Sequence, residues 1–254
     1  MSAVLDEARA TTRQVARTFA LACRLLPREV RDDVYLLYLV FRSLDDFVDD
    51  ELPEADERVA AVELWAAGED ADTPETRILT DLATRHDIPR AALIDFCAGM
   101  REDLEGTFYE TEADVDRYCY RVAGTVGVVM ASVLGSPDSA RPAAAALGKA
   151  MQRTNILRDI DEDVANGRVY FARETLERFG SLAPGEREAL LRDQIARADA
   201  LYEQGIAGIP QLHRGRRAIA AAADMYRELL RRLEAEGYGV RPGRAFVPRS
   251  RKLA

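Results

Sequence analysis

The sequence predicts an all-α, single-domain protein. Almost no segment alternates polar and apolar residues with period two, whereas apolar residues recur at spacings of three and four throughout the 254 residues. Proline and glycine occur in short clusters between these segments, and no low-complexity linker or repeat divides the chain. With 48% hydrophobic residues the chain can bury a sizeable core. We therefore expect one helical domain over residues 1–254.

The first half of the chain predicts one long amphipathic helix and several shorter ones. The long helix runs from about Arg28 to Asp50, because apolar residues from Val30 to Val48 step by three and four. In the 74–86 helix Thr73 precedes Pro74, a typical N-cap followed by proline in the first turn. The shorter helices are expected over residues 3–25, 54–67, 74–86 and 90–105.

Two further long helices are predicted in the second half. One opens at Thr111 with Asp114 as a capping box, and its apolar stripe continues to Val133. The next runs from about Asp138 to Val164 and ends at Asn166-Gly167, a typical C-terminal signal. Two more helices are expected over residues 186–205 and 213–236.

Composition excludes several classes of protein. Thirty-five Lys and Arg against 44 Asp and Glu leave a net charge of −9, which argues against nucleic acid as a partner. Three cysteines, odd in number and far apart, suit a reducing cytoplasm better than a disulfide framework. No apolar run approaches the ~20 residues of a membrane-spanning helix. The N-terminus lacks the order of a signal peptide. We expect a cytoplasmic protein.

Carboxylates continue the inward-facing stripes of two long helices. Asp45 follows Phe41 by four residues, and Asp49 follows Asp45 by four. An acidic cluster is usually solvated helix surface, but like charges four residues apart repel each other and are unfavourable when buried without partners. The later helix has a polar face with the same spacing, which consists of Gln152, Asn155, Asp159 and Asp163. Two such carboxylate pairs therefore indicate cations held between helices, and ligands that are all oxygen favour Mg²⁺ or Mn²⁺.

The substrate expected at these carboxylates is a prenyl diphosphate. Mg²⁺ takes one or two protein carboxylates, and phosphate oxygens complete its shell. Arg42 and Arg158 lie within one turn of the acidic pairs, where guanidinium groups can clamp a diphosphate. No Walker or dinucleotide-binding motif is present, and apolar stripes including Val129 and Met130 would form the walls of a tunnel for a hydrocarbon tail. Mid-helix Gly124 and Gly127 fit close approach of either a neighbouring helix or a ligand.

Four blocks resemble the squalene/phytoene synthase family, in the order in which that family carries them. The first acidic region corresponds to TFALACRLLP at residues 18–27, LYLVFR at 37–42 and DDFVD at 45–49. The central tyrosine motif corresponds to YCYRVAGTVG at 118–127, and the second acidic motif to QRTNILRDIDEDVANGRVYF at 152–171. A weaker match resumes at AADMY, residues 222–226.

The resemblance implies an isoprenoid synthase fold with a central cavity between helices and two aspartate-rich walls. It also implies head-to-head condensation of two allylic C15 or C20 prenyl diphosphates through a cyclopropylcarbinyl diphosphate, with release of diphosphate. The product would be of the phytoene, dehydrosqualene or squalene type. Proton loss ends the first two reactions. NADPH is required only if squalene is the product.

The resemblance also implies roles for individual residues. Asp45 and Asp49 match the first metal-binding wall, and Asp159 and Asp163 the second. Tyr118 matches a tyrosine acting near the cation or the leaving group. Substrate or diphosphate contacts are implied for Thr18, Phe19, Arg42, Gln152, Asn155, Arg158 and Tyr226.

Two rival functions stay open on the sequence. A terpene cyclase acting on one diphosphate would share the scaffold, and the region at residues 180–202 is shorter than is usual in the family. A non-catalytic isoprenoid-binding or assembly protein would be expected to lose the acidic walls, which are intact here. We also expect peripheral contact with the inner face of the membrane, while the sequence leaves the oligomeric state and the choice between C15 and C20 open.

Overall fold

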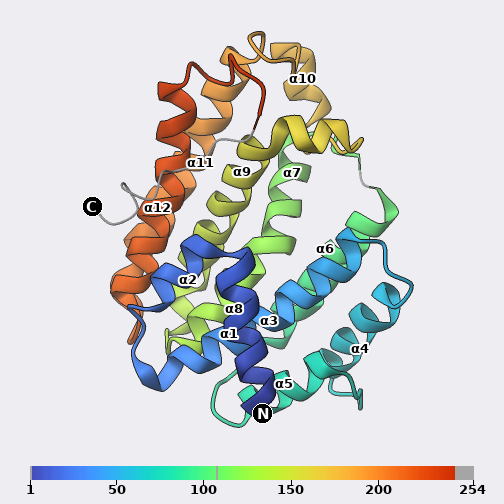
Figure 1. The fold of residues 1–254 in the computed structure, drawn as a ribbon, viewed down its shortest axis with the longest axis vertical. Coiled ribbons are helices and arrows are strands. Elements are labelled where there is room, and N and C mark those ends of the chain that lie inside the picture. The colour runs from blue at the N-terminus through green and yellow to red at the C-terminus, as the bar shows by residue number, and fades with distance from the viewer. Residues whose placement is uncertain (1, 107, 244–254) are drawn as a thin grey trace.

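Every regular element of the described chain is a helix (Figure 1). The computed structural model describes residues 2–106 and 108–243, except for the side chain of Arg17. Short turns of 3₁₀ helix occur at Asp138–Ala140 and Ile209–Gln211. The α-helices are α1 (Ser2–Val15), α2 (Arg17–Cys23), α3 (Arg28–Asp49), α4 (Ala55–Ala67), α5 (Pro74–Ala83), α6 (Arg90–Glu105), α7 (Glu112–Cys119), α8 (Thr125–Val133), α9 (Arg141–Ala165), α10 (Arg173–Phe179), α11 (Glu188–Gly208) and α12 (Arg216–Ala235).

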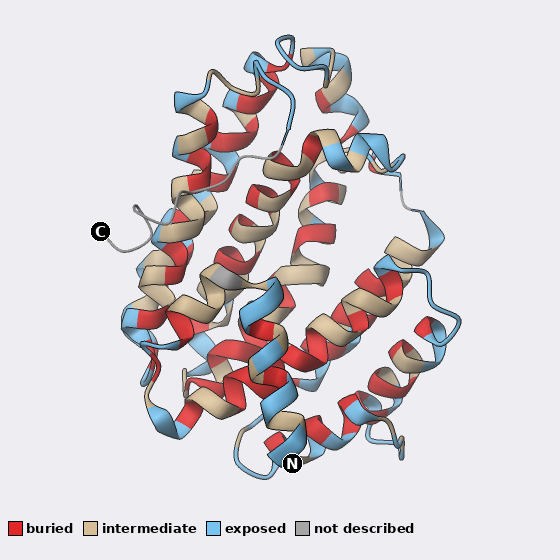
Figure 2. Cartoon of the chain, viewed as in Figure 1, coloured by how far each residue is buried: buried red, intermediate tan, exposed pale blue. Residues whose placement is uncertain are grey.

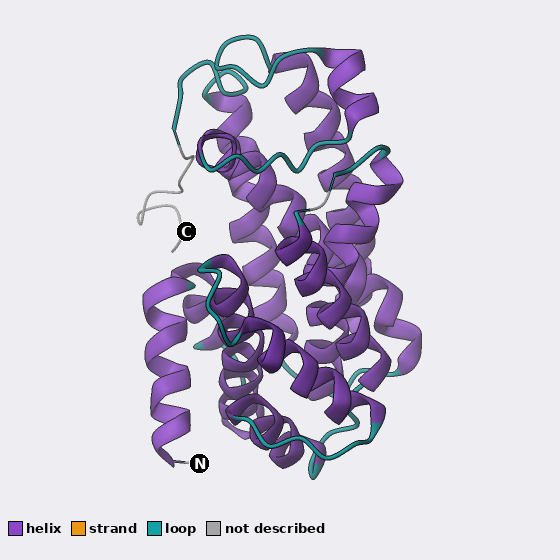
Figure 3. Cartoon of the chain, turned by 90° about the vertical axis from the view of Figure 1, so that its right-hand side faces the viewer, coloured by secondary structure: helices purple, strands orange, loops and turns teal. Residues whose placement is uncertain are grey.

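The helix predicted over residues 3–25 is broken in two. Ala16 leaves the helical region, with φ −114° and ψ 58°, and separates α1 from α2. The break lets the two pieces pack on different partners, because α1 contacts α3 whereas α2 contacts α12. Helix α1 lies at the outer edge of the bundle beside the N-terminus (Figure 3), and its buried residues are Ala8 and Thr12.

The second predicted long helix contains an irregular segment. Its capping box is confirmed, since Thr111 and Asp114 each bond the other's backbone N–H. Between α7 and α8, however, residues Tyr120–Gly124 form a π-helical turn. Such a turn rotates the following helix face relative to the preceding one. Helix α10 was not predicted, because its seven residues are too few for a recognisable periodicity.

Glycines allow α8 and α9 to touch backbone to backbone. A Cβ atom at Gly127 would lie 2.3 Å from the carbonyl oxygen of Ala144, and one at Gly148 would lie 2.1 Å from that of Ala123. Any larger residue at these positions would push the helices apart. Helix packing therefore accounts for the mid-helix glycine at 127, which also lines the cavity described below.

Buried residues occur along most helices of the bundle (Figure 2), and the hydrophobic ones among the described residues form two clusters. The first surrounds α3 and contains Leu37 and Leu44, both fully buried. The second lies where α9, α11 and α12 meet and contains Leu190, Tyr202 and Leu230. Helices α3 and α9 each pack one face into a cluster and present a few polar residues to the cavity described below, among them Arg42 and Asp45 of α3 and Asn155 and Arg158 of α9.

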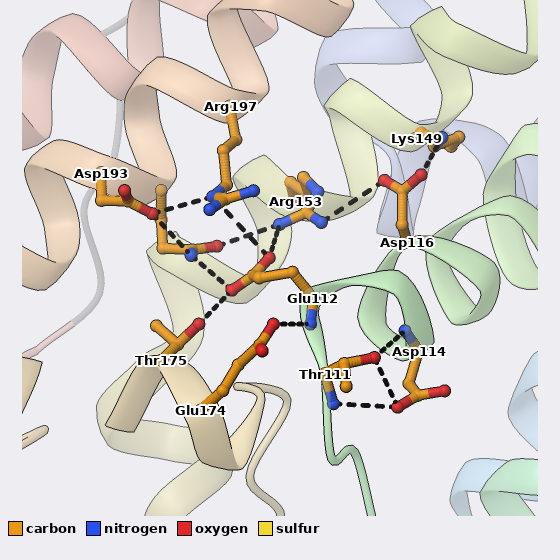
Figure 4. Close-up of polar contacts among 11 residues, drawn as sticks. Thr111, Glu112, Asp114, Asp116, Lys149, Arg153, Glu174, Thr175, Asp193 and Arg197 are labelled. Carbon is orange, nitrogen blue, oxygen red and sulfur yellow. Dashed lines mark hydrogen bonds and ion pairs between the residues drawn. The ribbon is translucent and has the colours of Figure 1, made fainter. Parts of the chain in front are cut away.

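A buried polar network holds α9 against its neighbours (Figure 4). Arg153 of α9 donates to the Gln194 Oε1 atom of α11 at 2.9 Å, and Gln194 donates to Glu112 Oε1 of α7 at 2.7 Å. Arg153 also pairs with Glu112 at 3.2 Å. These contacts link three helices through buried or nearly buried polar groups, although Arg153 Nε has no partner among the described residues, and they fix the register of the helices.

Candidate active site

A cavity of about 440 Å³ lies between α2, α3, α8, α9 and α12. Its walls are mostly apolar and include Phe19, Phe41, Val126, Met130 and Leu134. Met130 therefore faces the cavity as expected. Val129 does not line it and is fully buried in the first cluster, because neighbouring residues of a helix point about 100° apart. The polar lining consists of Arg42, Asp45, Gln152, Asn155, Arg158 and Tyr226.

On α3 the carboxylates follow the buried stripe, as predicted. Asp45 lies one turn beyond Phe41, and its carboxylate accepts a hydrogen bond from Arg42 Nη1 at 2.7 Å. Arg42 also pairs with Asp46, while its Nε atom is buried without a partner among the described residues. Burial, reinforced by the nearby charge of Asp49, raises the pKa of Asp45 to about 7 even though Arg42 acts in the opposite direction.

Asp49 connects the two acidic motifs. It lies on the last turn of α3, and its Oδ1 atom accepts from Arg168 Nη1 at 2.8 Å. Arg168 follows the C-terminus of α9, 119 residues further along the chain. The two acidic segments are therefore brought to the same end of the molecule.

On α9 the polar face predicted from residue spacing is present. Arg158 Nε donates to Asp159 Oδ1 at 2.8 Å. Burial, followed by the charge of Asp159, raises the pKa of Asp163 to about 6. Asn155 donates to Gln152 Oε1 at 3.3 Å, whereas its own Oδ1 atom is buried without a hydrogen-bond partner in the described chain. This unsatisfied oxygen and the Arg42 Nε atom mark the cavity end that is suited to a polar ligand.

A further carboxylate, Asp103 of α6, was missed by the sequence analysis. Burial raises its pKa to about 7, against a hydrogen bond from Tyr118, and the charges of Asp49 and Asp45 add to the rise. The Tyr118 hydroxyl donates to Asp103 Oδ2 at 3.3 Å. The available signal was the one that identified Asp45, since Asp103 continues the buried stripe of Phe96 and Met100.

The tyrosine predictions divide between two places. Tyr226 lines the cavity. Tyr118 is buried in the second cluster instead, with its ring centroid 5.3 Å from those of Tyr109 and Tyr170. Burial and the neighbouring Asp103 raise the pKa of Tyr118 well above its usual range, so its hydroxyl is a hydrogen-bond donor at neutral pH. Thr18 precedes the cavity-lining Phe19 on α2 and lies outside the cavity lining.

The acidic residues fit metal ions that share their ligands with a substrate. Within residues 2–106 and 108–243, no three or more His, Cys, Asp or Glu side chains are grouped so as to hold a metal ion by themselves. The charge of Asp49 contributes to the raised pKa of Asp45, so these two carboxylates repel each other. Such a pair can bind Mg²⁺ when phosphate oxygens complete the coordination shell of the ion. The donor set is compatible with Mg²⁺ bound together with a diphosphate.

Comparisons with known proteins place the chain in a family. The squalene/phytoene synthase family model matches residues 12–251. A phytoene synthase from Thermus thermophilus is 40% identical over 238 residues, covering 87% of this chain and 80% of the relative. A 15-cis-phytoene synthase from Synechococcus elongatus is 34% identical over 283 residues, covering 100% and 91%.

A solved structure extends the likeness to the fold. The crystal structure of a dehydrosqualene synthase in complex with a ligand matches with a TM-score of 0.90 and 29% identity, covering 99% of this chain and 93% of the other. The sequence match and the structural match both span nearly the whole chain, including both acidic walls and the cavity. This chain therefore belongs to the squalene/phytoene synthase family.

Proposed function

We propose that this chain joins two C20 prenyl diphosphates head to head, ends the reaction by proton loss as a phytoene-type synthase does, and requires Mg²⁺. The observation that carries the proposal is the cavity, whose polar end holds Asp45, Arg42, Asn155 and Arg158 above long apolar walls. The choice of C20 and of proton loss is supported by the relatives named phytoene synthase.

The polar end of the cavity binds the diphosphate groups. Arg42 and Arg158 present guanidinium donors that match phosphate oxygens, and in the absence of substrate they pair with Asp45, Asp46 and Asp159. Mg²⁺ held by Asp45, Asp49, Asp159 and Asp163 would neutralise the charge that develops on the departing diphosphate. Binding of substrate would release the arginines from their carboxylates and leave both partners for the ligand.

The apolar part of the cavity protects the reacting carbons. One substrate loses diphosphate to give an allylic cation, and the double bond of the second attacks it. Proton loss then closes a cyclopropylcarbinyl diphosphate. Walls such as Phe41, Met130 and Leu134 exclude water that would otherwise quench the cations. After the second diphosphate leaves, rearrangement and a second proton loss give the uncharged product.

Substrate and product are both lipids, so we place the protein in peripheral contact with a membrane. No helix among the described residues is long and apolar enough to traverse a bilayer. The contact would therefore be made by the protein surface.

A thermal melt in EDTA, in Mg²⁺, and in Mg²⁺ with inorganic diphosphate tests the site. A ligand at ~100 times its dissociation constant stabilises the native state by about 2.7 kcal/mol. For a chain of this size that corresponds to a rise in Tm of about 5–10 °C. Mg²⁺ alone should do less. The Asp159→Asn/Asp163→Asn variant should lose the shift, and an equal shift in both proteins would show that the ligand binds elsewhere.

The reaction itself is tested by product analysis. The protein is incubated with Mg²⁺ and C15 or C20 diphosphate, with and without NADPH, and the products are identified by mass spectrometry. We expect a C40 hydrocarbon from the C20 substrate, independent of NADPH. A cyclised product formed from a single prenyl diphosphate would contradict the proposal, and so would a product whose formation requires NADPH.

A further inference from the structure

A dense cluster of arginines lies on the outer side of α1, α2 and α3. Five arginines and a single aspartate line a hollow of about 390 Å³. Each helix contributes at helical spacing, with Arg9 and Arg13 on α1, Arg24 just after α2, and Arg28 and Arg31 on α3. We call this surface the arginine face. It contrasts with the whole chain, which carries a net charge of −9.

Most of the charge of the arginine face is left uncompensated. Arg9 pairs with Asp32 at 2.8 Å and with Asp6 at 3.4 Å. The Arg31 guanidinium donates hydrogen bonds to the backbone carbonyls of Leu26 and Arg24. In the described chain, Arg13, Arg24 and Arg28 are exposed and have no carboxylate within ion-pair distance. Their mutual repulsion is relieved when an anionic partner binds.

One exposed apolar side chain borders the same face. Leu25, which follows Arg24 directly after α2, is 54% exposed. Basic residues combined with exposed apolar ones are the two signals that together hold a protein on an anionic membrane surface. A soluble phosphate would use the arginines and leave Leu25 in water.

Only one helix separates the arginine face from the cavity. Phe19 of α2 lines the cavity while Ala20 of the same helix lines the arginine hollow. Val15 and Ala16, at the junction of α1 and α2, are also part of the cavity wall. The surface that carries the uncompensated positive charge is thus the outer side of the wall that encloses the proposed prenyl chains.

We propose that the arginine face docks this protein on an anionic lipid bilayer, with Arg13, Arg24 and Arg28 against phosphate headgroups and Leu25 inserted between them. The inference rests on the proposed function, because a lipid substrate and product give the cavity a reason to face a membrane. Electrostatics sets the orientation, since the acidic remainder of the molecule is repelled by the same surface.

Flotation with lipid vesicles tests the docking without using catalysis. We expect the protein to float with phosphatidylcholine vesicles that contain phosphatidylglycerol, and not with pure phosphatidylcholine. The Arg13→Glu/Arg24→Glu/Arg28→Glu variant should bind at least about 100-fold more weakly, because each basic residue near an anionic surface contributes several-fold to partitioning. Binding should also fall in about 0.5 M NaCl, which screens these charges.

A matched control separates the face from net charge. The Arg77→Glu/Arg117→Glu/Arg192→Glu variant makes the same change in charge at exposed positions on α5, α7 and α11, and it should still float. If the first variant does not fold, the corresponding three Arg→Gln changes replace it. The Leu25→Ser variant should bind more weakly than wild type at any salt concentration.

Several results would overturn the docking proposal. The first is that wild-type protein does not bind vesicles containing phosphatidylglycerol, as expected if the partner is a soluble phosphate or an acidic protein. The second is an equal loss of binding in both arginine variants. Prenyl transfer in detergent-solubilised substrate is measured in parallel and should be unchanged by the arginine-face variant. Vesicle binding without any prenyl product would refute the proposed function alone, and product without vesicle binding would refute the docking alone.

Discussion

The two acidic walls share a spacing of four residues but differ in their surroundings. On α3, Asp45 and Asp46 share one guanidinium, that of Arg42, and burial with the charge of Asp49 raises the pKa of Asp45 to about 7. On α9, Asp159 has an arginine of its own, because Arg158 donates two hydrogen bonds to it. Asp45 is therefore less well neutralised than Asp159 in the absence of a cation, whereas Asp49 of the first wall pairs with Arg168 and burial raises the pKa of Asp163 in the second wall to about 6.

The supports of the walls differ as well. Helix α3 lies among apolar side chains of the first cluster, and its buried polar contacts run to α5 and the residues just after it. Ser43 donates to Glu75 at 2.7 Å, and Asp33 accepts a hydrogen bond from Arg85 at 3.0 Å. Helix α9 rests on the network of Arg153, Glu112 and Gln194, and further along on Asp161, which accepts two hydrogen bonds from Arg187. Equal motif spacing thus does not set equal charge states. The partners that each helix meets across the fold decide how much of the wall is neutralised before a ligand arrives.

The largest expected effect comes from removing one charge from either wall. Asp45→Asn and Asp159→Asn should each lower kcat by at least ~10²-fold, the scale for loss of one preorganised electrostatic contribution. Asp50→Asn makes the same substitution at an exposed position just beyond α3. This variant is the matched control and should retain activity. Steady-state assays with prenyl diphosphate measure the effect. Wild-type turnover in either wall variant would remove that wall from the active site.

Asp161 and Asp159 are two residues apart, yet their loss should have different consequences. The Arg187 side chain is 4% exposed, and Asp161 accepts hydrogen bonds from the Arg187 guanidinium and from the Gly243 N–H. Asp161→Asn should lower the free energy of unfolding by about 2 kcal/mol, less than for a fully buried pair because Asp161 is partly exposed. Urea unfolding should show a smaller decrease in the free energy of unfolding for Asp159→Asn than for Asp161→Asn. The reverse ranking would mean that the Arg187 pair does not support α9.

Adjacent positions on α8 distinguish the cavity from the core. Val129→Ala should lower stability by about 1.5 kcal/mol without changing substrate preference, because Val129 is fully buried away from the cavity. Met130→Ala should shift the C15/C20 preference toward the longer chain, with each methylene contact worth ~0.8 kcal/mol. Competition assays with both diphosphates measure this, and an unchanged preference in Met130→Ala would contradict the wall assignment.

The smallest expected effect is a pH dependence of stability. In the folded protein burial raises the pKa values of Asp45 and Asp103 to about 7 and that of Asp163 to about 6. The unfolded chain releases these protons near pH 4. Between those values the folded state binds more protons, so stability should fall as pH rises from about 4 to 7.

Melts in EDTA across this range test the sign. Asp103→Asn should flatten the fall, because an amide carries no proton to release. A rise in Tm between about pH 4 and 7 would show that the raised pKa values are absent. Adding Mg²⁺ with diphosphate should oppose the fall, since these ligands bind the deprotonated carboxylates.

Local patterns in the sequence were sufficient for the helices and for much of the site. Apolar spacing predicted the long helices and placed Asp45 on an inward face, and the capping box at Thr111 and Asp114 was confirmed. These features depend on residues within one or two turns, so the sequence alone could determine them. The cavity likewise contains Arg42, Gln152, Asn155, Arg158 and Tyr226, as the motifs implied.

Tertiary structure alone decided which distant side chains meet. Nothing near Ala16 in sequence required a break, yet α1 and α2 pack on different helices. Asp161 belongs to the same acidic motif as Asp159 but pairs with Arg187, and Asp103 approaches Asp45 and Asp49 from another helix. A residue's helical face follows from its own neighbours in sequence. Its partner across the interface, and hence its charge state, follows from how separate helices pack.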